Sequence, residues 1–347
     1  MKISLYATKR PLFIMYENLL DLNKLYKAFA ESKRNVSWKA SVQRYEANVL
    51  LNIYQLRKSL INGTYKQKPF YEFDINERGK LRHIKSIHIS DRILQKAICN
   101  EILPVLEKYM IYDNAASRTK KGTDFSRKRL ALFLTEYYKQ YGNDGYVLKI
   151  DISKYFDSIS HEKLVAMIGD KIKDKKAEEL IGQLIDTFGG AYGLGLGAQL
   201  SQIGGIFYLH QLDNFCKIVK GIRWYVRYMD DIIIIGKDKK YLYDILSDIE
   251  HILSGLDLKL NKKKTQIIKI SSGFVYLKIR YILQADGHIV KIPDKSTFLR
   301  EKRKIKKLSS DILRMQFKSW HNNLLRFDCK RKLYNMRKLM AEQEKAE

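Results

Sequence analysis

Apolar residues recur every three or four positions over several long stretches of the chain, which is the spacing of an amphipathic helix. Gly63 fits the C-terminal stop of one such helix, and Ser90 fits the N-cap of the next. The pattern predicts helices over residues 15–31, 41–62, 91–108 and 240–256, and helical structure again from about 294 onward.

Shorter apolar runs between these helices predict strands. Residues 71–87 are expected to form two strands around a turn at 76–79, and residues 145–152 a short strand. A hairpin is expected at 223–235 and one further strand at 274–283. Helices, then mixed strands, then helices indicate an α+β fold in which a sheet carries acidic residues.

Three aspartates stand at the ends of these predicted strands. Asp151 lies near the end of strand 145–152, and Asp230 and Asp231 lie at the tip of the hairpin. If the strands are neighbours in one sheet, three carboxylates converge at its edge, where divalent cations would relieve their repulsion. An isolated Asp-Asp is also an ordinary turn sequence. The apolar strands on both sides and the second strand-ending aspartate favour a site for two Mg²⁺ ions, to which the carbonyl of Ile152 adds an oxygen.

Charge narrows the class of partner. The 347 residues include 65 Lys and Arg against 38 Asp and Glu, a formal net charge of +27. Such an excess favours an anionic partner, first of all nucleic acid, although a solvated lysine-rich surface is the plain alternative. Cys99, Cys216 and Cys329 match no zinc spacing and are expected to be reduced thiols of a cytosolic protein. No apolar run is long enough for a transmembrane helix, so no membrane partner is expected.

The residues around the aspartates resemble a known family. "YMDD" between apolar strands is similar to the active-site motif of reverse transcriptases, and "KIDISKYFDSI" (149–159) resembles the family's first catalytic motif. The resemblance follows the family's order over about residues 45–290. It implies an RNA-directed DNA polymerase shaped as a right hand, with two Mg²⁺ held by Asp151, Asp230 and Asp231. The expected divisions are N-terminal helices and fingers with part of the palm (1–144), palm (145–285) and a small helical thumb (286–347).

The same resemblance implies residues that bind the incoming deoxynucleotide. Phe156 falls at the family's steric gate, although a core phenylalanine is an equal alternative. Lys80 and Arg82 are candidates for gripping the triphosphate, and Lys264 for contacting the leaving pyrophosphate. Lys278 stands where the family's primer-grip strand often has glycine.

The loop "GLGLGAQLSQ" (193–202) departs from the common family pattern. Leu196 replaces a glutamine and Gln202 a proline, while Gly197 allows close backbone approach to base and sugar. This version resembles the enzymes of diversity-generating retroelements and, in part, unclassified and phage-defence reverse transcriptases. It implies error-prone synthesis of cDNA.

The resemblance also implies partners: a structured noncoding or template RNA, a DNA primer or cDNA product, deoxynucleotides and a basic accessory protein. Two basic stretches are candidate nucleic-acid contacts, and a bacterial or phage-encoded cytoplasmic enzyme is expected. The alternatives are an antiphage-defence reverse transcriptase, which copies a noncoding RNA or extends DNA without a conventional primer, and a non-catalytic RNA-binding scaffold. The candidate nucleic-acid contacts are Arg118, Lys120, Lys121, Lys302 and Arg303.

Overall fold

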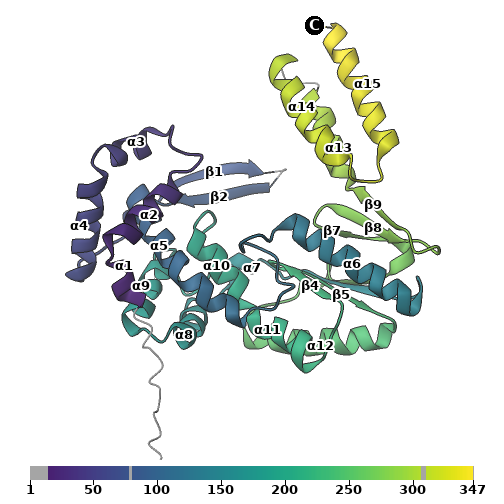
Figure 1. Ribbon diagram of the computed structural model, residues 1–347. Coiled ribbons are helices and arrows are strands. Elements are labelled where there is room, and N and C mark those ends of the chain that lie inside the picture. The colour runs from purple at the N-terminus through teal and green to yellow at the C-terminus, as the bar shows by residue number, and fades with distance from the viewer. Residues whose placement is uncertain (1–14, 78–79, 306–309, 347) are drawn as a thin grey trace, which may run out of the picture. The chain divides into compact units, whose positions relative to one another are not determined.

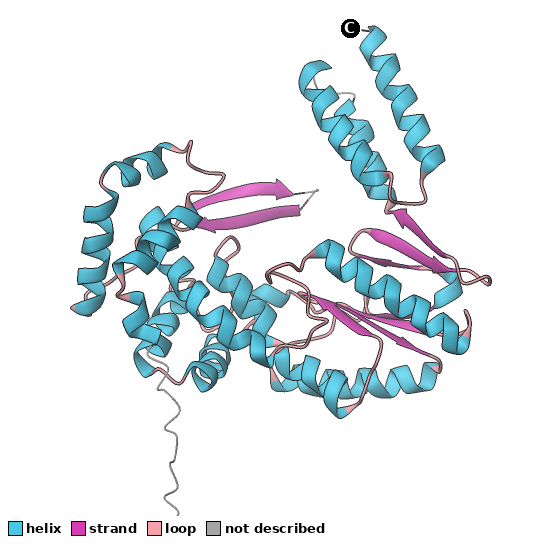
Figure 2. Ribbon diagram, in the orientation of Figure 1, coloured by secondary structure: helices cyan, strands magenta, loops and turns pink. Residues whose placement is uncertain are grey.

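The computed structural model describes residues 15–77, 80–305 and 310–346, and it divides into two compact units made of discontinuous segments (Figure 1). The first unit comprises Met1–Tyr112, Ser153–Lys220 and His251–Lys259. The second unit comprises Asp113–Ile152, Gly221–Glu250 and Leu260–Glu347. Helices and antiparallel strands are both well represented, so the fold class is α+β, as predicted (Figure 2).

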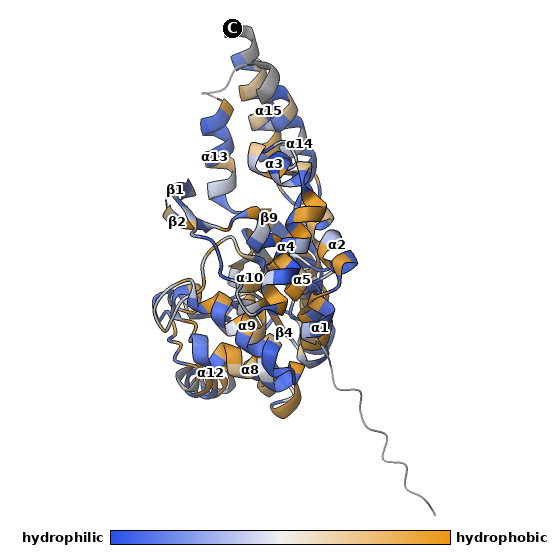
Figure 3. Cartoon of the chain, turned by 90° about the vertical axis from the view of Figure 1, so that its left-hand side faces the viewer, coloured by the Kyte–Doolittle hydropathy of each residue, from blue (hydrophilic) through white to orange (hydrophobic). Residues whose placement is uncertain are grey.

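The first unit is mainly helical and is built around the long helix α5 (Ile89–Leu106), most of whose apolar side chains are buried. Helices of this unit alternate apolar and polar positions along their length (Figure 3). The others are α1 (Met15–Leu19), α2 (Leu22–Ser32), α3 (Ala40–Ala47), α4 (Val49–Ile61), α7 (Tyr155–Ser158), α8 (His161–Ile172), α9 (Lys175–Asp186), α10 (Gln199–Tyr208) and α11 (His210–Asn214), with a 3₁₀ turn at Glu107–Tyr109 and a π turn at Phe215–Val219.

Several helix boundaries differ from the prediction. The stretch 15–31 breaks before α2, because the Asp21 side chain accepts a hydrogen bond from the backbone N–H of Asn23 and caps a new helix. The stretch 41–62 breaks at Asn48, which leaves the helical backbone region. Helix α5 begins two residues earlier than expected: His88, not Ser90, is the N-cap, and its Nδ1 accepts from the Ser90 backbone N–H at 3.3 Å.

A two-stranded hairpin, β1 (Tyr71–Glu77) and β2 (Lys80–Ser86), also belongs to the first unit and confirms the two strands predicted there. Its base packs through a small cluster in which Phe70 stacks on Phe188, with ring centroids 5.4 Å apart. Lys85 donates a hydrogen bond to the carbonyl of Phe188 at 2.9 Å. The hairpin is thereby tied to the segment that leads into the glycine-rich loop.

The second unit is centred on a four-stranded antiparallel sheet in the order β4 (Tyr225–Tyr228), β5 (Asp231–Gly236), β3 (Tyr146–Ile150) and β6 (Gln266–Lys269). Both faces are covered, because α6 (Thr123–Tyr141) and α12 (Lys239–Gly255) lie on opposite sides of the sheet (Figure 1). Burial on both faces explains why β5 is an unbroken apolar run instead of an alternating one.

A second sheet, β7 (Phe274–Tyr276), β8 (Ile279–Leu283) and β9 (Ile289–Pro293), shares one core with α6 and the first sheet. The prediction of one strand over 274–283 was wrong. The chain turns back at Leu277 and Lys278, which have φ angles of 45° and 69°. Periodicity missed this turn because neither residue is a usual left-handed turn former.

Three C-terminal helices complete the second unit: α13 (Lys295–Ile305), α14 (Ser310–Leu324) and α15 (Lys330–Ala346). They enclose a separate apolar core that includes Phe298, Ile305, Phe317 and Leu333. No helix within the described ranges has both the length and the apolar character needed to cross a bilayer. Cys99, Cys216 and Cys329 are buried, and no disulfide joins them.

Candidate active site

Asp151 and Asp231 are brought together by the register of the central sheet. Strands β3 and β5 are antiparallel, and Ile150 at the end of β3 pairs with Ile232 near the start of β5. One residue further along each strand, Asp151 and Asp231 stand at the same edge of the sheet. The β4–β5 hairpin places Asp230 beside them, because Tyr228 pairs with Asp231.

Arg227, whose side chain is fully buried, stabilises the turn of the β4–β5 hairpin. Met229 has a φ of 54°, a left-handed conformation, and its carbonyl accepts a hydrogen bond from Arg227 Nη1 at 2.8 Å. The backbone of Arg227 also pairs with the segment at Asp113–Ala115, which lies along the outer edge of β4. The turn that presents Asp230 is therefore fixed by a buried cation and by an extra backbone pairing.

The two hairpin carboxylates sit in an environment that opposes their negative charge. Burial raises the pKa of Asp230, and the charge of Asp151 adds to this effect. Burial and the charge of Asp230 together raise the pKa of Asp231 to about 6, against the opposing influence of Lys149. Carboxylates with raised pKa values, gathered at one sheet edge, gain from a bound cation.

Asp151 differs from its neighbours because it is surrounded by donors. Asn261 Nδ2 donates to Asp151 Oδ2 at 2.9 Å, and Lys264 Nζ lies 3.2 Å from the same oxygen. The backbone N–H of Asp151 donates to Thr265 Oγ1 at 3.3 Å. The Lys264 side chain is 57% exposed, so its ammonium group is a solvent-accessible counter-ion at the rim of the site.

The carbonyl of Ile152 faces the strand that carries Asp231. Ile152 pairs with Leu260, and the hydrogen bond beside this pair runs from the N–H of Asn261 to the carbonyl of Asp151 at 2.8 Å. Ile152 is therefore in a non-hydrogen-bonded pair, in which its own carbonyl points away from Leu260 and toward the β5 side. An oxygen ligand is thus available next to the carboxylates.

The oxygens that could act as metal ligands are carboxylate and carbonyl oxygens on rigid strands, and these are the ligands that hard divalent cations prefer. As the side chains stand, no three His, Cys, Asp or Glu groups among the described residues converge closely enough to hold a metal ion. The ammonium of Lys264 lies against Asp151 where a cation would bind.

Phe156 belongs to the first unit and is half-buried there. Its ring lies edge-on to Tyr155, with centroids 5.6 Å apart. It also packs on Gly205 of α10, where an added Cβ would come within 3.1 Å of two ring carbons. The absence of a side chain at Gly205 is what allows the ring its position.

The glycine-rich loop places the predicted nucleotide-binding residues at the start of α10. Gly197 has a φ of 104°, a conformation that favours glycine, and lies beside Ile84 of β2. Leu196 is partly buried, whereas Gln202 is exposed on the first turns of α10. Lys80 and Arg82 lie on β2 opposite Glu77 and Ile75, and their side chains lie outside the described part of the structure.

The predicted nucleic-acid contacts fall at two places in the second unit. Arg118 Nη1 donates to the carbonyl of Asn114 at 3.0 Å, so it braces the loop before α6. Lys120 is exposed, and Lys121 lies over the ring of Phe125 at 5.2 Å. Lys302 and Arg303 are exposed on α13.

Sequence reasoning missed Arg227, Asn261 and Thr265. Arg227 lies three residues before Asp230, and a lone arginine inside an apolar strand is the signal that was available. Asn261 and Thr265 flank the three lysines after the predicted helix. Their roles depend on pairing with Asp151, more than 100 positions away in the chain.

Comparisons with known proteins show what the chain as a whole is similar to. A family model described as "Reverse transcriptase (RNA-dependent DNA polymerase)" matches residues 66–308. Protein YkfC of Escherichia coli strain K12 is 26% identical over 282 residues, which cover 68% of this chain and 73% of that protein. The retron Ec48 reverse transcriptase of Escherichia coli is 27% identical over 239 residues, covering 64% of this chain and 57% of that one. Among solved structures, telomerase from Candida albicans, in complex with a fragment of telomeric RNA, superimposes with a TM-score of 0.52 at 12% identity, over 80% of this chain and 59% of that chain.

Proposed function

Because the chain belongs to the reverse transcriptase (RNA-dependent DNA polymerase) family and has a right-hand polymerase fold, we propose that it synthesises DNA on an RNA template. The observation that carries this proposal is the gathering of Asp151, Asp230 and Asp231 at one edge of a buried sheet, within the matched region. The raised pKa values of Asp230 and Asp231 are expected of carboxylates whose ionised form is stabilised when cations are bound beside them.

In the proposed mechanism, the carboxylates of Asp151, Asp230 and Asp231 and the carbonyl of Ile152 would hold two Mg²⁺ ions. When bound, Mg²⁺ makes a primer 3′-hydroxyl a better nucleophile and neutralises charge on the pyrophosphate. The rigid sheet fixes the oxygens before the substrate arrives, which reduces reorganisation during the reaction. Lys264, which pairs with Asp151 here, would leave it if a cation bound there, and its ammonium would then be able to contact or protonate the leaving pyrophosphate.

The remaining assignments are part of the same proposal. Fingers (with N-terminal helices and part of the palm), palm and thumb correspond to residues 1–144, 145–285 and 286–347. Phe156 is proposed as the gate that excludes a 2′-hydroxyl, and Lys80 and Arg82 as triphosphate contacts. The template RNA and the primer or product strand would meet the exposed cations of the second unit, including Lys120, Lys302 and Arg303. A basic accessory protein is proposed as a further partner.

Primer extension on an RNA template tests the function. The wild type should extend a primer with deoxynucleotides and Mg²⁺, and Asp230→Ala combined with Asp231→Ala should lower the rate by more than about a thousandfold. Asp244→Ala combined with Glu250→Ala is the matched control, because it removes two exposed acidic groups from α12. Equal rates in both double variants would remove the site assignment. A folded wild type that binds RNA but extends no primer would favour the non-catalytic scaffold.

For the pathway we propose error-prone copying in a diversity-generating retroelement. Leu196 stands where most of the family has glutamine, and an aliphatic side chain cannot make the amide's hydrogen bonds near the incoming nucleotide. We expect the products that are copied from a defined RNA template to contain fewer errors for Leu196→Gln than for the wild type. The errors of the wild type should be concentrated opposite template adenines, and sequencing of the products measures both. Identical error spectra would contradict this proposal.

A role in antiphage defence is the second candidate, and Lys278 favours it, because this residue departs from the family's usual primer grip. The genes beside this one distinguish the two pathways. A variable-protein gene with an imperfect repeat supports diversification, and a toxin gene or a defence island supports immunity.

A further inference from the structure

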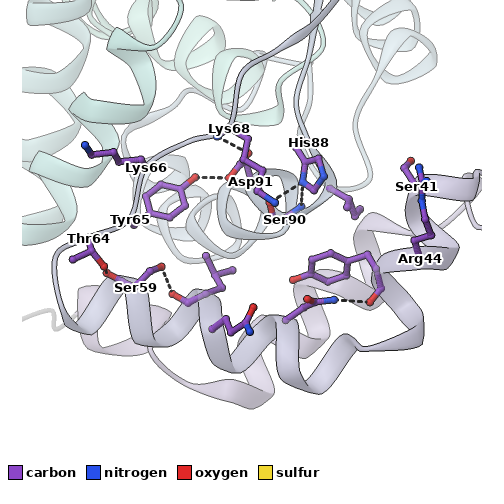
Figure 4. Close-up of a pocket in the computed structure, with 15 residues that line it drawn as sticks. Ser41, Arg44, Ser59, Thr64, Tyr65, Lys66, Lys68, His88, Ser90 and Asp91 are labelled. Atoms are coloured by element: carbon purple, nitrogen blue, oxygen red, sulfur yellow. Dashed lines mark hydrogen bonds between the residues drawn. The ribbon is translucent and has the colours of Figure 1, made fainter.

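A cavity of about 560 Å³ lies in the first unit, between helices α3 and α4 and the start of α5 (Figure 4). Its volume falls within the roughly 300–1,000 Å³ typical of small-molecule sites. All of its lining residues lie between positions 41 and 91, whereas the three carboxylates of the proposed polymerase site belong to the second unit. Nothing in the proposed synthesis mechanism uses this cavity.

The charged side chains that line the cavity are mostly basic. Arg44, Lys66 and Lys68 line it, and within the described part of the chain none of the three forms an ion pair. The first turn of α5 also reaches the cavity through Ile89 and Ser90, and a helix N-terminus favours anions. The lining therefore offers unneutralised positive charge to a ligand.

Asp91 is the one acidic residue that lines the cavity, and both of its carboxylate oxygens accept hydrogen bonds from the protein itself. It is only 1% exposed. Tyr65 Oη donates to its Oδ1 at 2.9 Å, and the backbone N–H of Lys68 donates to its Oδ2 at 3.1 Å (Figure 4). Asp91 thus holds the segment that carries Tyr65, Lys66 and Lys68 against α5, and its charge offsets part of the charge of Lys68 but not that of Arg44 or Lys66.

A second, independent observation points to a ligand. Tyr45 lines the cavity with 8% of its surface exposed, and its hydroxyl has no hydrogen-bond partner among the described residues. Burial, with a contribution from Asp91, raises the pKa of Tyr45 to about 12, so this hydroxyl remains protonated at neutral pH. A buried donor without a partner is costly. The hydroxyl oxygen itself is buried in the wall of the cavity, so an acceptor oxygen on a ligand would satisfy it once the ring shifts slightly toward the cavity.

We propose that this cavity binds a nucleotide, either as a free molecule or as one unit of a bound RNA strand. The phosphate is taken by the lining cations, with Arg44 and Lys68 as the principal contacts, and the sugar or base accepts the hydrogen bond of Tyr45. The rings of Tyr45 and Tyr65, with Leu56 and Ile89, provide apolar surface for a planar base. The protein would then carry a nucleotide site separate from that of synthesis.

Isothermal titration calorimetry on the full-length chain tests this proposal. The probes are adenosine and guanosine 5′-monophosphate, inorganic phosphate and a short oligoribonucleotide, all in EDTA so that metal-dependent binding at the carboxylates is absent. We expect saturable binding of a monophosphate or of the oligoribonucleotide. Tyr45→Phe should weaken it about three- to tenfold, and Arg44→Ala combined with Lys68→Ala more than about tenfold.

Matched controls separate this site from the general positive charge of the protein. Tyr54→Phe removes an exposed hydroxyl from α4, and Lys58→Ala removes an exposed cation from the same helix, and both should change affinity less than about twofold. Binding of the monophosphate would show that the ligand is a free nucleotide. Binding of the oligoribonucleotide alone, if the cavity variants weaken it, would show that the ligand is one unit of an RNA strand.

Three results would overturn the proposal. The first is no saturable binding of a monophosphate, with oligoribonucleotide affinity equal in the wild type and in Tyr45→Phe. The second is binding that the cavity variants leave unchanged. The third is inorganic phosphate binding as tightly as the nucleotides, which would reduce the site to a phosphate site. None of these results bears on primer extension, so failure here is distinguishable from failure of the proposed function.

Discussion

The side-chain amide of Asn261 donates a hydrogen bond to Asp151 Oδ2 at 2.9 Å, and the backbone N–H of the same residue donates to the carbonyl of Asp151 at 2.8 Å. Asn261 thus fixes both the backbone and the carboxylate of the aspartate that directly follows β3. A carboxylate that must bind cations in a defined geometry depends on such orienting contacts.

Asn261→Ala should therefore impair catalysis while leaving the fold intact. Loss of one orienting hydrogen bond to a metal-binding carboxylate is expected to lower the primer-extension rate about 10- to 100-fold and to raise the Mg²⁺ concentration required. Lys262→Ala is the control, because this neighbouring side chain is exposed. If Asn261→Ala has the rate and Mg²⁺ dependence of the wild type, Asn261 does not position Asp151.

Lys264 and a bound cation compete for the same carboxylate. Because Lys264 Nζ lies 3.2 Å from Asp151 Oδ2, Mg²⁺ must displace it. We expect Lys264→Ala to bind Mg²⁺ more tightly in the absence of nucleotide, as measured by the Mg²⁺ concentration that gives half of the thermal shift, yet to extend primers more slowly. Lys263→Ala should behave as the wild type in both assays. Weaker Mg²⁺ binding by Lys264→Ala would show that the ammonium does not compete.

Asp231→Asn should stabilise the metal-free protein while abolishing synthesis. The pKa of Asp231 is raised to about 6, so the folded state holds this proton more tightly than the unfolded state, and ionisation of Asp231 destabilises the fold. The variant should gain about 1–3 kcal/mol of unfolding free energy in EDTA at pH 7. This gain should shrink as the pH falls through 6 and disappear only below about pH 3, where Asp231 is protonated in both the folded and the unfolded state.

Denaturant unfolding at several pH values measures this effect, with Asp244→Asn on the exposed side of α12 as the control. Addition of Mg²⁺ should stabilise the wild type more than Asp231→Asn. A variant that is less stable than the wild type in EDTA at pH 7 would show that the carboxylate is held by partners that outweigh its burial.

The sequence was sufficient for features that depend on short-range pattern. The β4–β5 hairpin and strand β3 follow from apolar runs bounded by polar residues, and the two strands β1 and β2 from a turn signal between them. The juxtaposition of Asp151 with Asp231 followed once those strands were assumed to be neighbours. The helix breaks at Asp21 and Asn48 did not follow, because apolar spacing continues through them.

Features that depend on distant partners could not be predicted. The turn at Leu277 and Lys278 has no local turn residue, and it is held by Arg127 Nη2, which donates to the carbonyl of Leu277 at 2.6 Å, and by the N–H of Asp294, which donates to the carbonyl of Lys278 at 2.8 Å. Arg127 and Asp294 lie far from the turn in the sequence. The orienting role of Asn261 was hidden for the same reason.

Replacing Lys278 with glycine should stabilise the second sheet. Lys278 has a φ of 69°, which costs a non-glycine residue about 1–2 kcal/mol, whereas glycine adds about 0.4–1 kcal/mol of unfolded-state entropy. The net gain is expected to be about 0.5 kcal/mol, measured by denaturant unfolding. Lys278→Ala removes the same charge but keeps the strain, so it should give no gain. An equal gain in both variants would assign the effect to charge.

Gly205→Ala should disturb the proposed sugar gate, because an added Cβ lies 3.1 Å from two carbons of the Phe156 ring. The ring must shift by a few tenths of an ångström, so we expect the free energy of unfolding to fall by about 1 kcal/mol. Discrimination between deoxyribonucleotides and ribonucleotides should also weaken.

Gly182→Ala in α9 is the matched control, because its new methyl group meets Val165 at an ordinary 3.6 Å. That variant should be stabilised by about 0.5–1 kcal/mol from helix propensity and should keep its discrimination. Single-nucleotide incorporation with each substrate gives the ratio of kcat/KM values. An unchanged ratio in Gly205→Ala, together with an unchanged ratio in Phe156→Ala, would show that Phe156 is a core residue and not a gate.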